Sequence, residues 1–82
     1  MAYTAEEIFT GLQQIGADLL GIEPEEITRE SNLVADFDAD SLDLVEMLLN
    51  VKKSFQVEVP KDELPNLLSV GDVADYVTNH QS

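Results

Sequence analysis

The sequence contains no cysteine and few basic residues: four lysines or arginines face seventeen aspartates and glutamates, and the formal net charge is −13 over 82 residues. The absence of cysteine excludes a disulfide framework, a thiolate metal site and a cysteine nucleophile. The negative charge repels nucleic acid and anionic membranes and favours basic partner surfaces. Because many globular proteins are acidic for solubility alone, the charge does not identify the partner.

Long apolar runs are also absent, since no stretch approaches the roughly 18–20 residues that span a bilayer. Residues 1–7 lack the basic region and apolar core of a secretory signal. We therefore expect no membrane insertion and a cytoplasmic location, or an organelle lumen if a transit peptide has been removed. Length and a hydrophobic fraction of 44% predict one small monomeric domain over residues 1–82, with a frayed tail over 79–82.

Apolar residues recur at helical spacing in most of the chain. Thr4 and Glu7 form a capping-box pattern before the first periodic segment, and Gly21 ends it. Residues 22–39 show no strong period apart from one possible helical turn at 24–28. The pattern predicts an all-α fold, a four-helix up-down bundle with one short third helix and a long loop between helices 1 and 2. The expected helices cover residues 5–20, 41–54, 60–64 and 70–79.

The most informative stretch is residues 36–46, a carboxylate-rich loop that runs through one serine into an apolar helix. Asp40 is a good helix N-cap, because its side chain can accept from free backbone N–H groups of the first turn. Asp43 lies three residues on, where a carboxylate complements the helix dipole. These positions place Ser41 first in the helix, with its hydroxyl exposed.

The helix that follows Ser41 is apolar on two sides. At about 100° per residue, its apolar residues fall in two stripes along the helix. One stripe suffices for a core, and the second indicates either more core or a docking surface. The first stripe contains Leu44, Met47, Leu48, Val51 and Phe55, and the second contains Leu42, Val45 and Leu49, rimmed by Asp43 and Glu46.

Two chemical interpretations find little support in the sequence. The spacing of Asp36, Asp38 and Asp40 is that of a calcium loop, but Ser41 and Met47 stand where an EF-hand requires Gly and Glu. We therefore predict no dedicated metal site. The single histidine, His80, lies in the predicted frayed tail, so no base accompanies Ser41 and no catalytic residues are predicted.

Residues 38–46 resemble the attachment motif of acyl carrier proteins, and the resemblance continues through residues 55–60 and 70–77. It implies that Ser41, with Asp40 and Leu42 beside it, carries 4′-phosphopantetheine. A separate phosphopantetheinyl transferase would install this arm, and Asp40 would lie near the metal site of the transferase. The chain would then be a carrier and not an enzyme, holding acyl intermediates as thioesters for partner enzymes of fatty-acid or polyketide-type synthesis.

The resemblance also implies roles for the two stripes. Basic-patched synthases, reductases and transferases would dock on Leu42, Asp43, Val45, Glu46 and Leu49. The acyl chain would lie in a pocket lined by Leu44, Met47, Leu48 and Leu64. Lys52 and Lys53 depart from the family pattern, in which acidic residues are usual there, and this departure indicates altered docking.

Two other functions remain open from the sequence. Within the same family, the cargo could be aminoacyl or peptidyl groups. Outside it, the chain could be an acidic protein-interaction module in which Ser41 merely helps to start the helix. Modification of Ser41 separates the module from both carriers.

Overall fold

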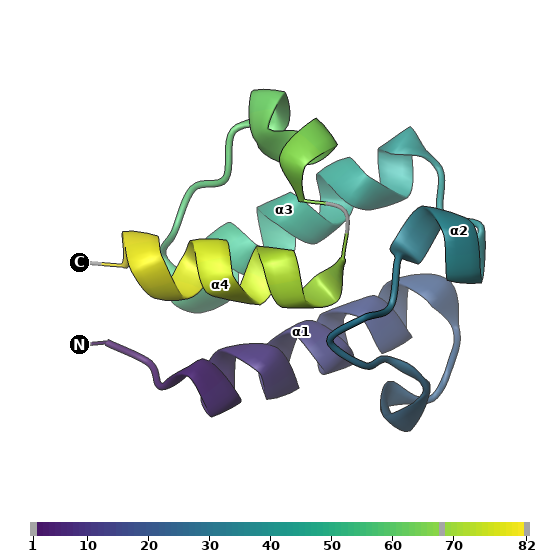
Figure 1. Cartoon of the computed structure of the whole chain (residues 1–82), viewed down its shortest axis with the longest axis horizontal. Coiled ribbons are helices and arrows are strands. Elements are labelled where there is room, and N and C mark those ends of the chain that lie inside the picture. Colours follow the sequence, from purple (N-terminus) through teal and green to yellow (C-terminus); the bar gives the residue numbers. More distant parts are fainter. Residues whose placement is uncertain (1, 68, 82) are drawn as a thin grey trace.

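A computed structural model describes residues 2–67 and 69–81, and its regular elements are all helical (Figure 1). The described residues contain no strand, which confirms the predicted all-α class. In chain order the elements are α1 (Ala5–Leu20), η1 (Pro24–Glu26), α2 (Leu33–Phe37), α3 (Ser41–Phe55), η2 (Lys61–Asn66) and α4 (Val70–His80), where η denotes a 3₁₀ helix.

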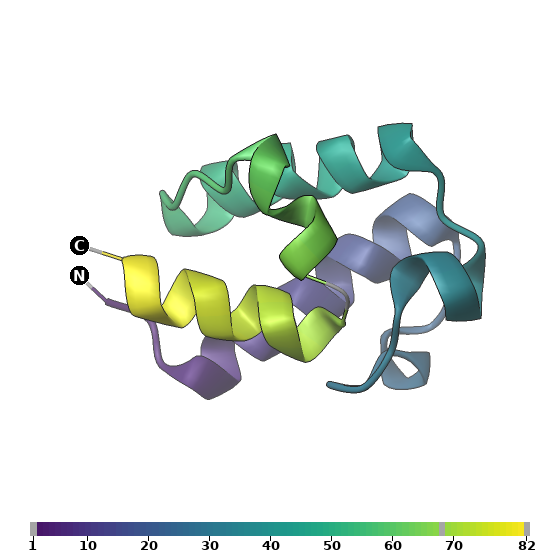
Figure 2. The same cartoon turned by 45° about the horizontal axis from the view of Figure 1, so that its top comes forward.

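The three long helices form the body of the bundle. Helix α1 packs against both α3 and α4. It runs in the direction opposite to both of them, and η2 crosses the gap between the end of α3 and the start of α4 (Figures 1 and 2). No described helix has the length and apolar character needed to cross a membrane.

Polar side chains fix the start of each long helix. Thr4, Asp40 and Ser69 each accept a hydrogen bond from a backbone N–H three residues on, and each belongs to a reciprocal capping box. Such caps satisfy backbone donors that have no partner within the helix. All three starts lie where the sequence predicts them.

The apolar stripes of these helices meet in one core. Its most deeply buried large side chains are Ile8, Ile27, Val51 and Val77, with exposed fractions of 0%, 1%, 0% and 0%. Three come from the long helices and Ile27 comes from the connection between α1 and α3. The core stripe predicted for α3 is buried at Met47, Leu48, Val51 and Phe55, and Leu44 is half-buried.

The connection between α1 and α3 is more ordered than the predicted long loop. The short turn predicted at 24–28 appears as η1, but α2 was not predicted and corrects the sequence interpretation. Asn32 starts α2 by accepting from the N–H groups of Val34 and Ala35, and both N–H···O distances are 3.0 Å. Asp38 ends α2 in the left-handed region at φ 60°.

The predicted third helix is present but differs in detail. It is the 3₁₀ helix η2, it begins at Lys61 and continues through Asn66, and Pro65 lies inside it. The predicted end of this helix at residue 64 is therefore wrong. The N–H of Leu67, the residue that caps the end of η2, bonds to the Leu64 carbonyl at 3.1 Å, so the 3₁₀ turn closes beyond Pro65.

The two ends of the chain lie side by side (Figures 1 and 2). The side chain of Gln81 donates to the Tyr3 carbonyl at 2.7 Å and accepts from the Tyr3 N–H at 2.8 Å. Helix α4 extends to His80, one residue beyond its predicted end, and the frayed tail over 79–82 stays a prediction. Ser82 lies outside the described residues.

Candidate functional site

The loop that leads into α3 is held by its backbone and by one buried side chain. The N–H of Asp38 bonds to the Val34 carbonyl at 3.0 Å, and the N–H of Ala39 bonds to the Leu33 carbonyl at 3.0 Å. Ala39 is buried, with 5% of its surface exposed. The last turn of α2 therefore fixes the position from which α3 begins.

Ser41 is the first residue of α3 and is exposed. Before it, Asp40 accepts from the Asp43 N–H at 2.9 Å, and Asp43 accepts from the Asp40 N–H at 3.2 Å. Because Asp40 caps the helix, the Ser41 hydroxyl is not needed as a cap, and it makes no hydrogen bond with any described residue. The result is an accessible hydroxyl at a capped helix start.

The single histidine lies far from this hydroxyl. His80 is on the last turn of α4, and its Nδ1 lies 2.8 Å from the Tyr76 carbonyl. Figure 1 places that end of α4 at the opposite end of the molecule from the start of α3. A nucleophilic dyad of Ser41 and His80 is therefore incompatible with the fold.

The outer stripe of α3 divides into two exposed leucines and a half-buried valine between them. Leu42 is 65% exposed and Leu49 is 54% exposed, whereas Val45 is half-buried. Of the two carboxylates beside the stripe, Glu46 is exposed and Asp43 is half-buried in its capping box. With half-buried Val45 between them, the two leucines leave an apolar strip on the exposed side of α3 that a partner can reach.

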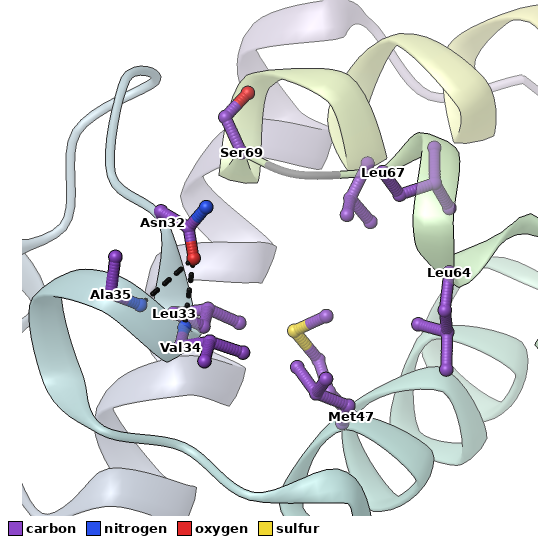
Figure 3. A pocket seen from close by; sticks show the side chains of 10 residues that line it. Asn32, Leu33, Val34, Ala35, Met47, Leu64, Leu67 and Ser69 are labelled. Atoms are coloured by element: carbon purple, nitrogen blue, oxygen red, sulfur yellow. Dashed lines mark hydrogen bonds between the residues drawn. The ribbon is translucent and has the colours of Figure 1, made fainter.

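An apolar pocket of about 320 Å³ opens beside the inner stripe, and α2, α3, η2 and the start of α4 all contribute to its walls. Three of the four predicted pocket residues, Leu44, Met47 and Leu64, line it. The Met47 thioether points into the space between α2 and η2 (Figure 3). The remaining lining residues are Asn32, Leu33, Val34, Ala35, Leu67, Ser69 and Val73.

The fourth predicted pocket residue, Leu48, does not line this pocket. It is 6% exposed and borders a separate groove on a neighbouring side of α3, with Val59 and Pro60. Met47 and Leu48 differ by one helix position, about 100° around the axis, so they face different neighbours. The sequence also missed the α2 wall of the pocket, although Asn32 followed by Leu33 and Phe37 at a spacing of four residues was an available signal.

The two lysines that depart from the resemblance lie near the end of α3. Lys52 and Lys53 are exposed in its last turn, where positive charge complements the helix dipole. The Lys52 ammonium lies 3.8 Å from a Glu58 carboxylate oxygen. The exposed side of α3 is therefore acidic near its start and basic near its end.

Comparison with known sequences gives a consistent result. Residues 10–77 match the protein family described as the phosphopantetheine attachment site. The chain is 40% identical to an acyl carrier protein of Rubrobacter xylanophilus over 77 residues, which cover 94% of this chain and 95% of the relative. It is 43% identical to a meromycolate extension acyl carrier protein of Mycobacterium leprae over 77 residues, which cover 94% of this chain and 67% of that relative.

Comparison with solved structures agrees. The fold superimposes on the acyl carrier protein of Enterococcus faecalis with a TM-score of 0.81 and 25% sequence identity, covering 96% of this chain and 100% of that chain. The similarity therefore extends over nearly the whole chain in both sequence and structure.

Proposed function

The chain belongs to the acyl carrier proteins with a phosphopantetheine attachment site, and we propose that Ser41 carries the phosphopantetheine arm. The protein is a carrier whose cofactor is phosphopantetheine. The observation that carries the assignment to Ser41 is its exposed hydroxyl at the first position of α3, free of hydrogen bonds to any described residue. When bound, the arm supplies a terminal thiol that holds acyl groups as thioesters.

The residues around Ser41 suit modification by another enzyme. The single histidine lies at the opposite end of the molecule from Ser41, so we propose that a phosphopantetheinyl transferase supplies both the base and the metal site. Asp40 uses one carboxylate oxygen to cap α3, and its other oxygen is available to face the transferase. The capping box holds this carboxylate at the residue directly before Ser41.

The outer stripe of α3 supports a docking role. We propose that Leu42, Val45 and Leu49 provide apolar anchors for partner enzymes of acyl-chain synthesis. Asp43 and Glu46 would then meet basic patches on those enzymes, which orients the encounter and raises its rate. The exposure of Leu42 and Leu49 supports this proposal, because the core does not need them.

The apolar pocket supports an acyl cargo over an aminoacyl one. We propose that Leu44, Met47 and Leu64 shelter the apolar part of the cargo, with α2 forming the opposite wall. A hydrocarbon chain gains about 0.8 kcal/mol for each buried CH₂, whereas a charged amino group loses hydration there. Names of the relatives point to fatty-acid or mycolate-type synthesis, and polyketide synthesis, a monomeric state and a cytoplasmic location stay predictions.

The test is the intact mass of the full chain after incubation with coenzyme A and a broad-specificity phosphopantetheinyl transferase. We expect a gain of one phosphopantetheine arm in the native chain and no gain in the Ser41→Ala variant. Circular dichroism of the variant would show that it is folded. No gain with several transferases would contradict the proposal and favour an interaction module in which Ser41 only starts a helix.

A further inference from the structure

A second hollow lies on another side of α3 from the apolar pocket. This groove of about 190 Å³ runs between the second half of α3 and the segment 58–61 that follows it. Its walls combine an apolar floor with charged side chains at the rim. The floor contains Val45, Leu48, Leu49, Val59 and Pro60, and the rim contains Lys52, Glu58 and Lys61.

The rim of the groove is unusual because positive charge is scarce in this chain. Three of its four basic residues, Lys52, Lys53 and Lys61, lie at this end of α3 and the start of η2. The fourth, Arg29, pairs with Asp75 at 2.9 Å in another part of the structure. A chain of net charge −13 thus concentrates its cations beside one apolar groove.

The lysines at the rim are available to a partner. Lys52 and Glu58 are 3.8 Å apart, with side chains 58% and 76% exposed, so this pair is worth little in water. Lys61 is exposed and forms no ion pair with any residue in 2–67 or 69–81. Two ammonium groups can therefore be contacted without breaking a strong internal interaction.

We propose that this groove binds an apolar side chain of a partner protein that is flanked by carboxylates. The floor would take the apolar side chain, and Lys52 and Lys61 would pair with the carboxylates. Charge complementarity favours a short acidic protein segment over a nucleic acid, because a long polyanion also meets the surrounding carboxylates of this chain. The contact does not involve Ser41, so this proposal can be tested separately from attachment of the arm.

The groove also makes the two ends of the exposed side of α3 different in charge. Leu42 and Lys52 are ten residues apart, about 15 Å along the helix. A partner that is basic opposite Asp43 and Glu46, and acidic opposite Lys52, can therefore sit on α3 in only one orientation. The reversed orientation would oppose like charges at both ends, which disfavours it.

The test uses a defined probe and isotope-labelled full chain, with and without the arm. The probe is a hexapeptide with two central leucines and two glutamates on each side, capped at both ends. Backbone amide shifts are followed by NMR in 0.15 M salt, where the Debye length of about 8 Å screens the distant carboxylates. We expect saturable shifts centred on Leu49, Lys52 and Lys61 in both forms of the chain.

Three charge-matched variants separate the groove from total charge. Lys52→Glu and Lys61→Glu should each weaken peptide binding by about threefold to tenfold, since each removes an exposed charge pair and adds a repulsive one. Lys53→Glu makes the same change in net charge in the last turn of α3, but Lys53 does not line the groove. Its affinity for the peptide should stay within about twofold of the native chain.

Four results would overturn the proposal. They are the absence of saturable shifts, equal weakening by Lys53→Glu, equal binding of a peptide with lysines in place of the glutamates, and shifts of the groove amides that depend on protein concentration alone. The last result would assign the groove to a second copy of this chain. None of them depends on whether Ser41 accepts an arm.

Discussion

The starts of α3 and α4 have the same kind of cap, yet a serine hydroxyl is free at the start of α3 and used as the cap in α4. Each begins with a reciprocal capping box between the N-cap and a carboxylate three residues later. In α4 the cap is a serine, and the Ser69 hydroxyl accepts from the Asp72 N–H at 3.1 Å. In α3 the cap is Asp40 and the serine comes one position later, so its hydroxyl is free for another use.

The coverage of the two helix starts differs as well. The loop before α2 covers the start of α4: the N–H of Val70 bonds to the Ser31 carbonyl at 2.9 Å, and the N–H of Gly71 bonds to the Arg29 carbonyl at 2.8 Å. The corresponding positions of α3, Ser41 and Leu42, are exposed. The start of α4 is covered by the chain itself, whereas the start of α3 is exposed, as the proposed attachment of the arm to Ser41 requires.

The first positions of the two helices should show the largest contrast in stability. Val70 is 3% exposed, so Val70→Ser would remove buried apolar surface and bury a hydroxyl, at a cost of about 2–4 kcal/mol. The reciprocal change, Ser41→Val, lies on the surface and should change the unfolding free energy by less than about 0.5 kcal/mol. Urea unfolding of both variants measures the contrast, and equal losses would refute it.

At the second positions of the two helices, Gly71 in α4 and Leu42 in α3, the loss of stability on substitution should differ less. A Cβ added at Gly71 would lie 2.9 Å from the Arg29 carbonyl oxygen, so Gly71→Ala should displace the covering loop and cost about 1–3 kcal/mol. Leu42 is 65% exposed, and Leu42→Ala should leave stability within about 0.5 kcal/mol of the native chain. Thermal unfolding compares the two variants. A stable Gly71→Ala chain would show that the loop does not hold this helix start.

Removing either cap should cost a similar amount of stability, but only one of the two removals should affect attachment of the arm. Ser69→Ala and Asp40→Ala each remove one cap and should each cost about 1 kcal/mol, which lowers the thermal midpoint of a domain this size by about 4–8 °C. Only Asp40→Ala should also slow transfer of the arm, because only Asp40 adjoins Ser41. Intact mass over time measures transfer, and slow transfer to the Ser69→Ala variant would contradict the division of roles.

The smallest loss of stability should come from breaking the ion pair beside the loop that covers the start of α4. Arg29 and Asp75 are 2.9 Å apart, but their side chains are 47% and 64% exposed. Because the Arg29 carbonyl, and not its side chain, holds Gly71, Arg29→Gln should cost less than about 0.5 kcal/mol. A thermal midpoint that falls as far as that of Gly71→Ala would show that the ion pair matters more than the backbone contact.

The sequence predicted the helix starts because caps are local. Thr4, Asp40 and Ser69 are each followed three residues later by a carboxylate, and these patterns require no knowledge of the fold. The end of α1 at Gly21 was predicted for the same reason. Gly21 adopts the left-handed conformation, at φ 68°, that glycine allows.

The sequence did not predict features that depend on neighbours distant in the chain. Asp38 takes the same left-handed conformation without being glycine, so nothing in the sequence marked the end of α2. The stripe periodicity placed Met47 and Leu48 together, but only the packed structure shows that Met47 faces α2 and η2 while Leu48 faces the groove beside Val59. The covering of α4 by residues 29–31 was likewise invisible to local patterns.

The most direct measurement of the central claim is the position of the arm along the chain. Trypsin cleaves after Arg29 and Lys52, which releases residues 30–52 with both Ser31 and Ser41, while Ser54 and Ser69 fall in other peptides. Tandem mass spectrometry of the modified native chain should place the arm on Ser41 alone. An arm on Ser31, Ser54 or Ser69 would show that the open start of α3 is not the attachment site.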